Sequence, residues 1–230
     1  MNELLLALTV ITYFSAAVVA EKFFGKAGLI GWVVIGSLWM NIELLKVVDA
    51  FGVQMTLGNV LLSSTFLCTD ILSEKYGKRA SRRAALVGAF AITASVVISQ
   101  LMLAFAPGSG DFAHSSMEVL FTQMPRMCLA SIATYVVAQL NDVWLYHKIW
   151  GITEKRFGKK RFLWLRNCGS TLVSQAINAF MFACIAWVGV YDLPMVIELG
   201  CATFAITAVL SLLDTPFVYL SRKLVPVKED

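Results

Sequence analysis

Residues 84–106 read AALVGAFAITASVVISQLMLAFA, an apolar stretch without a single charged side chain. The pair Pro107-Gly108, which is typical of a turn, follows it directly. A helix needs about 20 apolar residues to cross the roughly 30 Å hydrocarbon core of a bilayer. The stretch therefore predicts a membrane-spanning helix that ends before Pro107.

Six further apolar stretches flank this one. They cover residues 4–20, 28–48, 56–73, 125–146, 169–190 and 196–220. The chain of 230 residues is 58% hydrophobic and 15% charged, whereas soluble domains are about 45–50% apolar and about a quarter charged. Its 5 prolines and 15 glycines exclude a collagen-like chain. Its mean hydropathy of +0.73 excludes a disordered one. We expect an all-α polytopic membrane helical bundle with seven transmembrane helices, in which residues 1–230 form a single integral membrane domain.

The first stretch has some features of a signal peptide, because Val18-Val19-Ala20 mimics a cleavage site. A signal peptide begins with basic residues, but this chain begins Met1-Asn2-Glu3. Lys22 and Lys26 follow the stretch instead of preceding it. The pattern favours a retained helix with its N-terminus outside.

Basic residues gather in the loops after stretches 56–73 and 125–146 and at the C-terminus. They are Lys75, Lys78, Arg79, Arg82 and Arg83 in the first loop, Lys148, Lys155, Arg156, Lys159, Lys160, Arg161 and Arg166 in the second, and Arg222, Lys223 and Lys228 at the end. The loops after stretches 28–48, 84–106 and 169–190 are poor in lysine and arginine. This asymmetry predicts a multi-pass topology with a cytoplasmic C-terminus. The basic residues do not form the continuous basic stripe of a nucleic-acid-binding protein. We expect the lipid bilayer to be the partner of this chain, and the basic loops can also contact lipid headgroups.

Residues 107–124 form the longest predicted loop on the outer side. Its portion 117–121, with Phe112 upstream, is apolar enough for a short helix at the membrane surface or a lid.

Polar residues inside the predicted helices carry the functional signal. A charge near the bilayer centre costs about 2.5–3.5 kcal/mol, so such residues face the protein interior or a water-filled cavity. Asp70, Asp142 and Asp214 are equally spaced along the chain, near the inner ends of three helices that run in the same direction. We expect the helices at 28–48, 56–73, 125–146, 169–190 and 196–220 to surround a polar cavity, and those at 4–20 and 84–106 to face lipid.

The candidate substrate-binding residues are the polar and aromatic side chains that would face this cavity. They are Asn41, Phe66, Asp70, Glu74, Gln139, Asp142, Asn167, Gln175 and Asn178. An alternative is that such residues only join helices through hydrogen bonds, which average about 0.6 kcal/mol each. Asp214 and Glu74 can also reach the inner interface as snorkelling side chains.

The sequence lacks the motifs of the common catalytic and cofactor sites. It contains no GxxxxGK[ST] phosphate loop, no HExxH metal motif and no CxxC pair. His114 lies in a predicted loop and His147 at a helix end, so neither suits a catalyst inside the cavity. We expect no enzyme activity, no catalytic residue, no metal and no cofactor, and we interpret the five cysteines as small apolar fillers. A polar cavity without a reactive group fits the binding or passage of a small polar solute.

Residues 64–78, STFLCTDILSEKYGK, resemble the hallmark segment of the queuosine-precursor transporter family, also called the vitamin uptake transporter family. Residues 129–143, 166–175 and 214–217 resemble the family in the same order along the chain. The resemblance covers residues 39–224. It implies a six-helix family core, to which the helix at 4–20 is an N-terminal addition.

The resemblance implies import of 7-deazaguanine derivatives, such as preQ0, preQ1 or queuine, across the bacterial inner membrane. A carboxylate of Asp70 or Asp142 can accept hydrogen bonds from the guanine-like N1–H and amino group. Two further roles each have several candidates. The donor to the ring oxygen is Gln139, Gln175 or Asn178, and the aromatic ring that stacks on the substrate is Phe66, Trp39 or Trp144. An aminomethyl cation would favour a second carboxylate, for which Glu74 is the candidate.

Two positions depart from the family pattern. Many members carry an aspartate where this chain has Asn178 and a lysine near Thr207. If these form an ion pair in those members, the neutral pair avoids burying either charge alone. The departure leaves open which 7-deazaguanine is carried.

Two other function classes compete with this hypothesis. A substrate-binding subunit of an energy-coupling-factor vitamin importer would need a partner ATPase module. A membrane-embedded enzyme would need a reactive group in the cavity. Small residues on the helices at 4–20 and 84–106 would also permit a homodimer.

Overall fold

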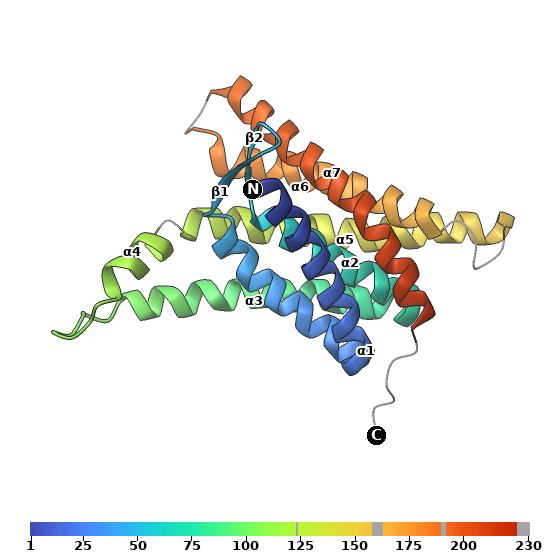
Figure 1. The fold of residues 1–230 in the computed structure, drawn as a ribbon, viewed down its shortest axis with the longest axis horizontal. Coiled ribbons are helices and arrows are strands. Elements are labelled where there is room, and N and C mark those ends of the chain that lie inside the picture. Colours follow the sequence, from blue (N-terminus) through green and yellow to red (C-terminus); the bar gives the residue numbers. More distant parts are fainter. Residues whose placement is uncertain (123, 158–162, 190–191, 225–230) are drawn as a thin grey trace.

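The computed structural model describes residues 1–122, 124–157, 163–189 and 192–224 (Figure 1). Lys159, Lys160, Arg161 and Lys228 of the basic segments, and the last residue of the predicted stretch 169–190, lie outside these ranges. The described chain forms a helical bundle with one small β-hairpin. Its elements are α1 (Asn2–Glu43), β1 (Val47–Ala50), β2 (Val53–Thr56), α2 (Gly58–Tyr76), α3 (Lys78–Leu103), α4 (His114–Thr122), α5 (Met124–Phe157), α6 (Leu163–Trp187) and α7 (Leu193–Lys223).

Helix α1 folds back on itself at Gly25. The backbone there has φ 55° and ψ −134°, a conformation that glycine adopts without steric cost. Figure 1 shows the two arms running side by side in opposite directions. Tyr13 on the first arm donates a hydrogen bond to Glu43 on the second, and its ring meets Trp32 edge-on. The predicted helices 4–20 and 28–48 are therefore these two arms.

The segment after α1 departs locally from the predicted helical bundle. The helix ends at Glu43, and Val47–Ala50 pairs with Val53–Thr56 as an antiparallel hairpin instead of continuing the helix to residue 48. Phe51 and Gly52 both have positive φ, as a two-residue hairpin turn requires. Adjacent β-branched residues at 47 and 48 favour a strand once the helix has stopped.

Helix α2 lies in the middle of the bundle and packs against α1, α3, α5 and α7. All of its residues from Gly58 to Ser73 are buried. Phe66 belongs to an apolar cluster that α2 forms with α3 and α5, whereas Ile71 belongs to a second cluster that it forms with α1 and α7. Because apolar contacts surround α2, its polar side chains are held inside the protein.

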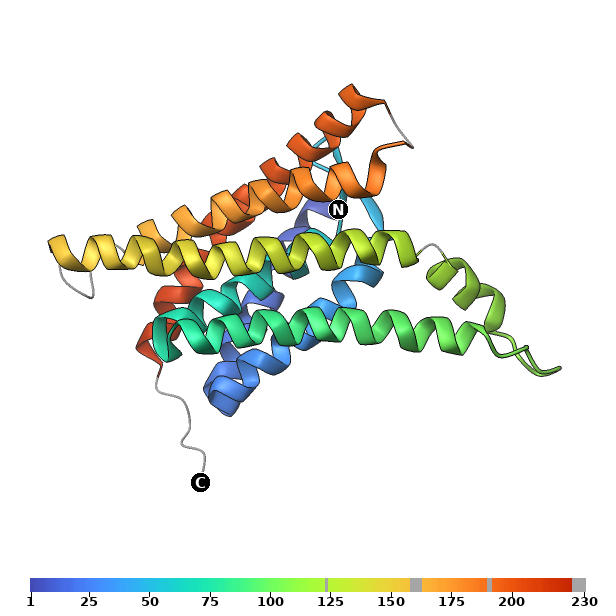
Figure 2. The same ribbon diagram turned by 180° about the vertical axis from the view of Figure 1, so that it is seen from behind.

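The remaining predicted stretches form α3, α5, α6 and α7, each of which extends beyond its predicted limits at one end or both. In Figure 2, α3 and α5 run lengthwise across the face nearest the viewer, with α6 and α7 on one side of them. Helix α7 starts with Pro194 in its first turn, where the missing N–H costs nothing. Pro216 lies inside α7 and removes one helical hydrogen bond close to Asp214.

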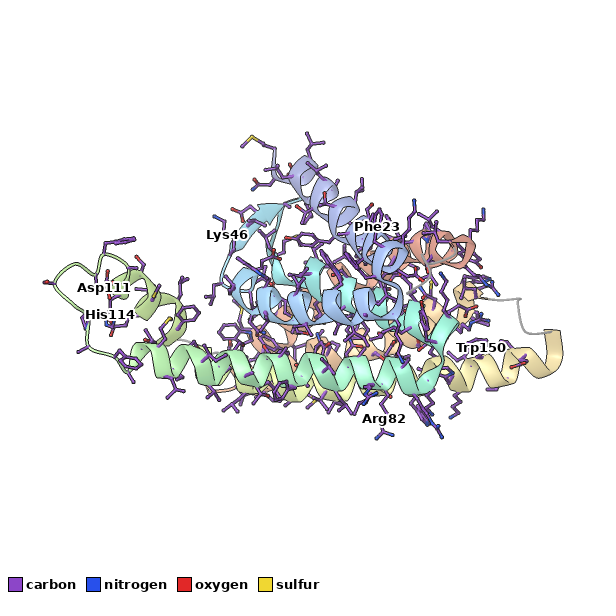
Figure 3. All side chains as sticks on the ribbon, turned by 90° about the horizontal axis from the view of Figure 1, so that it is seen from below. Phe23, Lys46, Arg82, Asp111, His114 and Trp150 are labelled. Carbon is purple, nitrogen blue, oxygen red and sulfur yellow. The ribbon has the colours of Figure 1, made fainter. Side chains whose placement is uncertain are left out.

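The short helix predicted within residues 107–124 is present as α4. Asp111 Oδ1 accepts hydrogen bonds from the backbone N–H groups of Ala113 and His114 and so starts the helix. Helix α4 packs on α3 and α5, and Gln100 Nε2 donates to the carbonyl of Phe121 at 3.0 Å. Figure 3 shows Asp111 and His114 at one end of the molecule and Trp150 at the other.

Five of the described helices are long and apolar enough to cross a membrane. They are α1, α3, α5 over Cys128–Glu154, α6 and α7. Helix α2 is not among the five, because buried polar residues lower its hydropathy. A central polar helix enclosed by apolar helices is what a membrane bundle with a polar interior requires.

The packing of the two arms of α1 predicts a specific sensitivity to added volume. A Cβ at Gly28 would lie 2.1 Å from the carbonyl oxygen of Ala20, whereas a Cβ at Gly31 would meet nothing within 4 Å. We expect Gly28→Ala to lower the free energy of unfolding by about 1–3 kcal/mol. The control Gly31→Ala is expected to raise it by about 0.4–1 kcal/mol. Chemical unfolding in detergent, followed by circular dichroism, measures both; equal stabilities would contradict this packing.

Candidate functional site

A cavity of about 470 Å³ lies at the end of the bundle that carries the β-hairpin. Its lining comes from the second arm of α1, from β2, and from α2, α5, α6 and α7. These are the five helices expected to surround a cavity, so their arrangement is confirmed, but of the nine predicted binding residues only Asn41 and Asn178 line it. Among the described residues, α3 and the first arm of α1 contribute nothing to the lining. We call this end the cavity end.

The cavity is lined by neutral groups. Its polar lining residues are Asn41, Thr56, Asn59, Ser131, Thr134, Tyr135, Asn178 and Thr203. Phe182 and Trp187 add aromatic surface. Within the described part of the chain, no Asp, Glu, Lys, Arg or His lines it. Amide groups that can donate and accept, beside flat aromatic rings, suit an uncharged polar heterocycle.

A hydrogen-bonded bridge between α2 and α5 lies deeper than the cavity. Gln139 Nε2 donates to Thr65 Oγ1 at 3.1 Å, and Thr69 Oγ1 donates to Gln139 Oε1 at 3.1 Å. All three side chains are buried. Along α2 the bridge lies between Asn59 in the cavity and Asp70, positions about 16 Å apart at 1.5 Å per residue. It therefore separates the cavity from the carboxylates beyond it.

Asp70, Asp142 and Asp214 come together beyond this bridge. Asp70, Asp142 and Asp214 lie close enough for their charges to act on one another. All three are fully buried. In the described ranges, no basic side chain pairs with them and no group of three metal-ligating residues forms. The equal spacing of these aspartates in the sequence thus corresponds to one acidic cluster.

Neutral donors from α6 face the acidic cluster. Thr171 Oγ1 donates to Asp70 Oδ2 at 3.1 Å, and Asn167 Nδ2 donates to Asp214 Oδ1 at 2.9 Å. Ser170 and Ser174 face Asp142, but no hydrogen bond of good geometry reaches either Asp142 oxygen within the described residues. Buried carboxylates that are only partly satisfied are costly. Their retention inside an apolar bundle is a functional signal.

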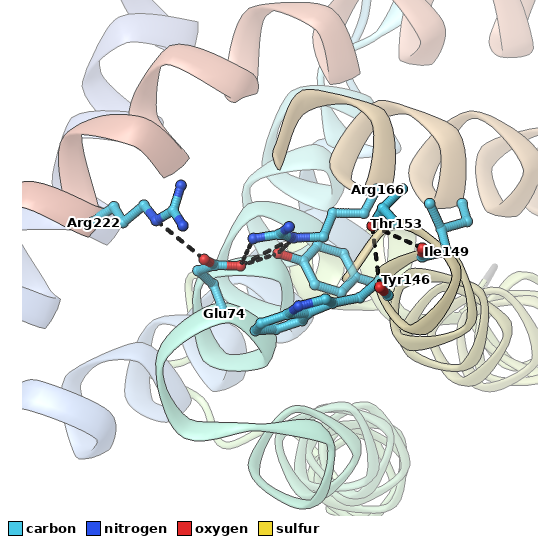
Figure 4. A network of polar contacts seen from close by, with 7 residues as sticks. Glu74, Tyr146, Ile149, Thr153, Arg166 and Arg222 are labelled. Atoms are coloured by element: carbon cyan, nitrogen blue, oxygen red, sulfur yellow. Dashed lines mark hydrogen bonds and ion pairs between the residues drawn. The ribbon is translucent and has the colours of Figure 1, made fainter. Parts of the chain in front are cut away.

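One turn beyond Asp70, the bundle is closed by a buried ion-pair network (Figure 4). Arg166 Nη2 lies 2.6 Å from Glu74 Oε2, and Arg222 Nε lies 3.2 Å from Glu74 Oε1. Tyr146 donates a hydrogen bond to the same carboxylate at 2.9 Å. Arg166 is fully buried, and its guanidinium lies 4.3 Å from the centre of the Trp150 ring. This network joins α2, α5, α6 and α7 in one place.

A second ion pair closes the same end between α1, α2 and the end of α7. Lys75 Nζ lies 2.5 Å from the buried Glu21 carboxylate and donates to the carbonyl of Leu224 at 3.0 Å. Lys75 and Glu74 are adjacent on α2, so neighbouring residues of this helix form the two ion-pair contacts that close this end of the bundle. We call this the basic end, because the basic turn between α2 and α3 also lies here.

Comparisons with known proteins show the family of this chain. Residues 56–221 match the family described as "Putative vitamin uptake transporter". The chain is 34% identical to the "Probable queuosine precursor transporter" of Bacillus subtilis (strain 168), over 95% of this chain and 94% of that protein. The chain belongs to the queuosine-precursor (vitamin uptake) transporter family. As a member with several long apolar helices, it is a multi-pass membrane protein. No solved structure matches it.

The structure separates the predicted binding residues of this family member into different environments. Asn41 and Asn178 line the cavity. Gln139 lies in the bridge; Asp70, Asp142 and Asn167 lie in or beside the acidic cluster; and Glu74 is held by two arginines. Phe66 is packed in the apolar core. Gln175 is buried, and its amide has no hydrogen-bond partner within the described ranges.

The structure also places the aromatic residues considered for stacking. Phe66 is in the core, while Trp39 and Trp144 are 55% and 49% exposed on the outside of the bundle. Lys148 Nζ lies 4.6 Å from the centre of the Trp144 ring. The aromatic lining of the cavity comes from Phe182 and Trp187 instead.

Sequence reasoning missed several residues of this site. Asn59 follows the β-hairpin and looks like a helix-start residue, so nothing in a single sequence marks it as cavity lining. Arg166 was expected in a basic loop, yet it is buried inside α6. Its signal was its position directly before the polar run that starts at Asn167. Thr207 and Asn178, which depart from the family pattern, are both buried and neutral.

The ion-pair network predicts a large loss of stability when one partner is removed. Arg166→Met leaves the Glu74 carboxylate buried with Arg222 alone, and we expect the free energy of unfolding to fall by about 3–5 kcal/mol. Adding Glu74→Gln should restore part of this loss, because the uncompensated charge is then gone. Thermal unfolding of both variants in detergent tests this. A double variant no more stable than Arg166→Met would mean that the arginine acts mainly through packing on Trp150.

Proposed function

We propose that this protein is an inner-membrane transporter that imports queuosine precursors, 7-deazaguanine derivatives such as preQ0, preQ1 or queuine. The cavity, the Gln139 bridge, the acidic cluster and the Glu74 ion-pair network follow one another along α2, and we call this series the polar column. The observation that carries the proposal is that its two ends differ. A neutral cavity lies at one end of the column, and buried ion pairs close the other. The printed name of the Bacillus subtilis relative supports the substrate class.

The proposed topology has seven spans within a single domain over residues 1–230. The two arms of α1, with α2, α3, α5, α6 and α7, make up this number. The basic end faces the cytoplasm under the positive-inside rule, so the N-terminus and the cavity face outside. In this orientation the described conformation is open to the outside and closed to the cytoplasm. Import then requires separation of Glu74 from Arg166 and Arg222.

Recognition begins in the cavity in this proposal. A cavity of about 470 Å³ is within the usual range for small-molecule sites. The amides of Asn41 and Asn178 can pair with the donor and acceptor edge of the heterocycle, while Phe182 or Trp187 contacts its face. Asp70 and Asp142 lie further along the path and accept the N1–H and amino group as the solute moves inward.

Transport by the purified chain alone is the decisive experiment. The protein, reconstituted into liposomes, should exchange labelled 7-cyano-7-deazaguanine for unlabelled compound inside, with guanine as the competitor control. Exchange without any added protein supports a self-sufficient transporter. Binding without exchange, with uptake in cells depending on ATPase partners, would favour the importer-subunit alternative. Absence of both binding and exchange would overturn the proposal.

Asp70→Asn is expected to abolish uptake while the protein remains folded in the membrane. The amide keeps the volume of the side chain but cannot act as the carboxylate acceptor in the column. Uptake of labelled substrate by cells, normalised to protein in the membrane fraction, measures the effect. Uptake at the normal rate would remove Asp70 from the path.

Asn178→Leu is expected to weaken substrate binding about 5- to 150-fold, which corresponds to about 1–3 kcal/mol for an unpaired polar edge. Val173→Leu on the same helix is the matched control, because Val173 is 47% exposed on the outside of the bundle. Equilibrium binding of labelled substrate to the purified variants gives both affinities. Equal affinities for the two variants would place recognition outside the cavity.

A further inference from the structure

A second pocket, of about 370 Å³, lies at the basic end between the turn of α1 and the first turns of α3. Four of the residues that line it are cationic: Lys26, Arg79, Arg82 and Arg83. The transport path does not use this pocket, because the path runs along α2, α5, α6 and α7. Figure 3 shows Arg82 projecting from α3 away from the bundle.

The four cations meet because of the local fold. Arg79, Arg82 and Arg83 are spaced i, i+3 and i+4 on α3, so they share one face of the helix. Lys26 comes from a segment far away in the sequence and is placed directly after the sharp turn at Gly25. A topology signal alone requires only basic residues on one side of the membrane, not their convergence on one pocket.

Among the described residues, the four pocket cations have no anionic partner, unlike three other basic residues at this end. Lys75 pairs with Glu21, and both Arg166 and Arg222 pair with Glu74. In the described part of the chain, no carboxylate forms an ion pair with any of the four pocket cations. Like charges one helical turn apart repel each other, so the pocket favours an added anion.

The start of α3 strengthens this preference. Gly77, which carries no side chain to cap the helix, precedes it, and its carbonyl accepts from the N–H groups of Ala80 and Ser81. The positive end of the helix dipole therefore lies among the same cations. Leu86, which is 47% exposed, completes the pocket with an apolar edge. Phe24, on the nearby turn of α1, is 64% exposed.

We propose that this pocket binds the phosphate headgroup of an anionic phospholipid from the cytoplasmic leaflet. The arginines can bind phosphate oxygens in a bidentate manner, and Lys26 adds a fourth charge. Leu86, which lines the pocket, offers an apolar surface for the acyl chains. A lipid bound here holds the turn of α1 against α3. The proposal depends on the membrane orientation given above, but not on the identity of the transported solute.

Lipid retention by the full-length protein tests the site. The protein is purified in detergent, offered phosphatidylglycerol or phosphatidylcholine, and analysed by native mass spectrometry. We expect the unaltered protein to retain phosphatidylglycerol several-fold better than phosphatidylcholine. Arg82→Gln/Arg83→Gln should reduce this preference at least threefold. The control Lys148→Gln/Lys223→Gln removes the same charge at the same end, outside the pocket, and should keep the preference.

The other outcomes would overturn the proposal. Equal losses in the two double variants would show that general charge, not this pocket, attracts the lipid. Full displacement of bound phosphatidylglycerol by millimolar inorganic phosphate would assign the pocket to a free phosphate-bearing solute. An equal retention of both lipids by the unaltered protein would mean that no anionic headgroup site exists. Circular dichroism of the two variants shows that each is folded before lipid is added.

Discussion

The cost of burying carboxylates in an apolar environment organises this molecule. Helix α2 carries Asp70 and Glu74 one turn apart, and neither can face lipid without a cost of several kcal/mol. The helix must therefore be enclosed, and α1, α3, α5 and α7 pack around it. The helices that face outward are long and apolar enough to span a membrane.

The two carboxylates of α2 are balanced in different ways. Glu74 is neutralised by Arg166 and Arg222 in a network that ties four helices together. Asp70 instead faces two other aspartates and receives a hydroxyl donor from Thr171. The ion-pair network closes one end of the bundle. In the acidic cluster, by contrast, several carboxylate oxygens have no hydrogen-bond partner among the described residues. At the closed end of the column the carboxylate is paired, whereas in its centre carboxylate oxygens are left to accept hydrogen bonds. This arrangement suits a path along which a polar solute moves.

Particular residues show how far the sequence could lead. The spans were predictable because an apolar run of about 20 residues matches the thickness of the hydrocarbon core and is typical of a transmembrane helix. The equal spacing of Asp70, Asp142 and Asp214 indicated only that they lie near the same ends of three helices, and their meeting in one cluster was not predicted. Asn59 and Arg166 were not predictable, since an asparagine at a helix start and an arginine near a basic loop have ordinary local roles. The β-hairpin was not predicted, because Val47 and Val48 continue an apolar run that is equally compatible with a helix.

The sequence by itself determined the class of protein, the approximate spans and the family, because hydropathy and linear motifs are properties of the chain. Only the tertiary structure decided which polar residues meet. It put Glu74 in an ion pair, left the oxygens of Asp142 without a hydrogen-bond partner among the described residues, and gave the cavity a neutral lining. The physical reason is that these outcomes depend on distances between helices far apart in the sequence, and side-chain packing across the bundle sets those distances.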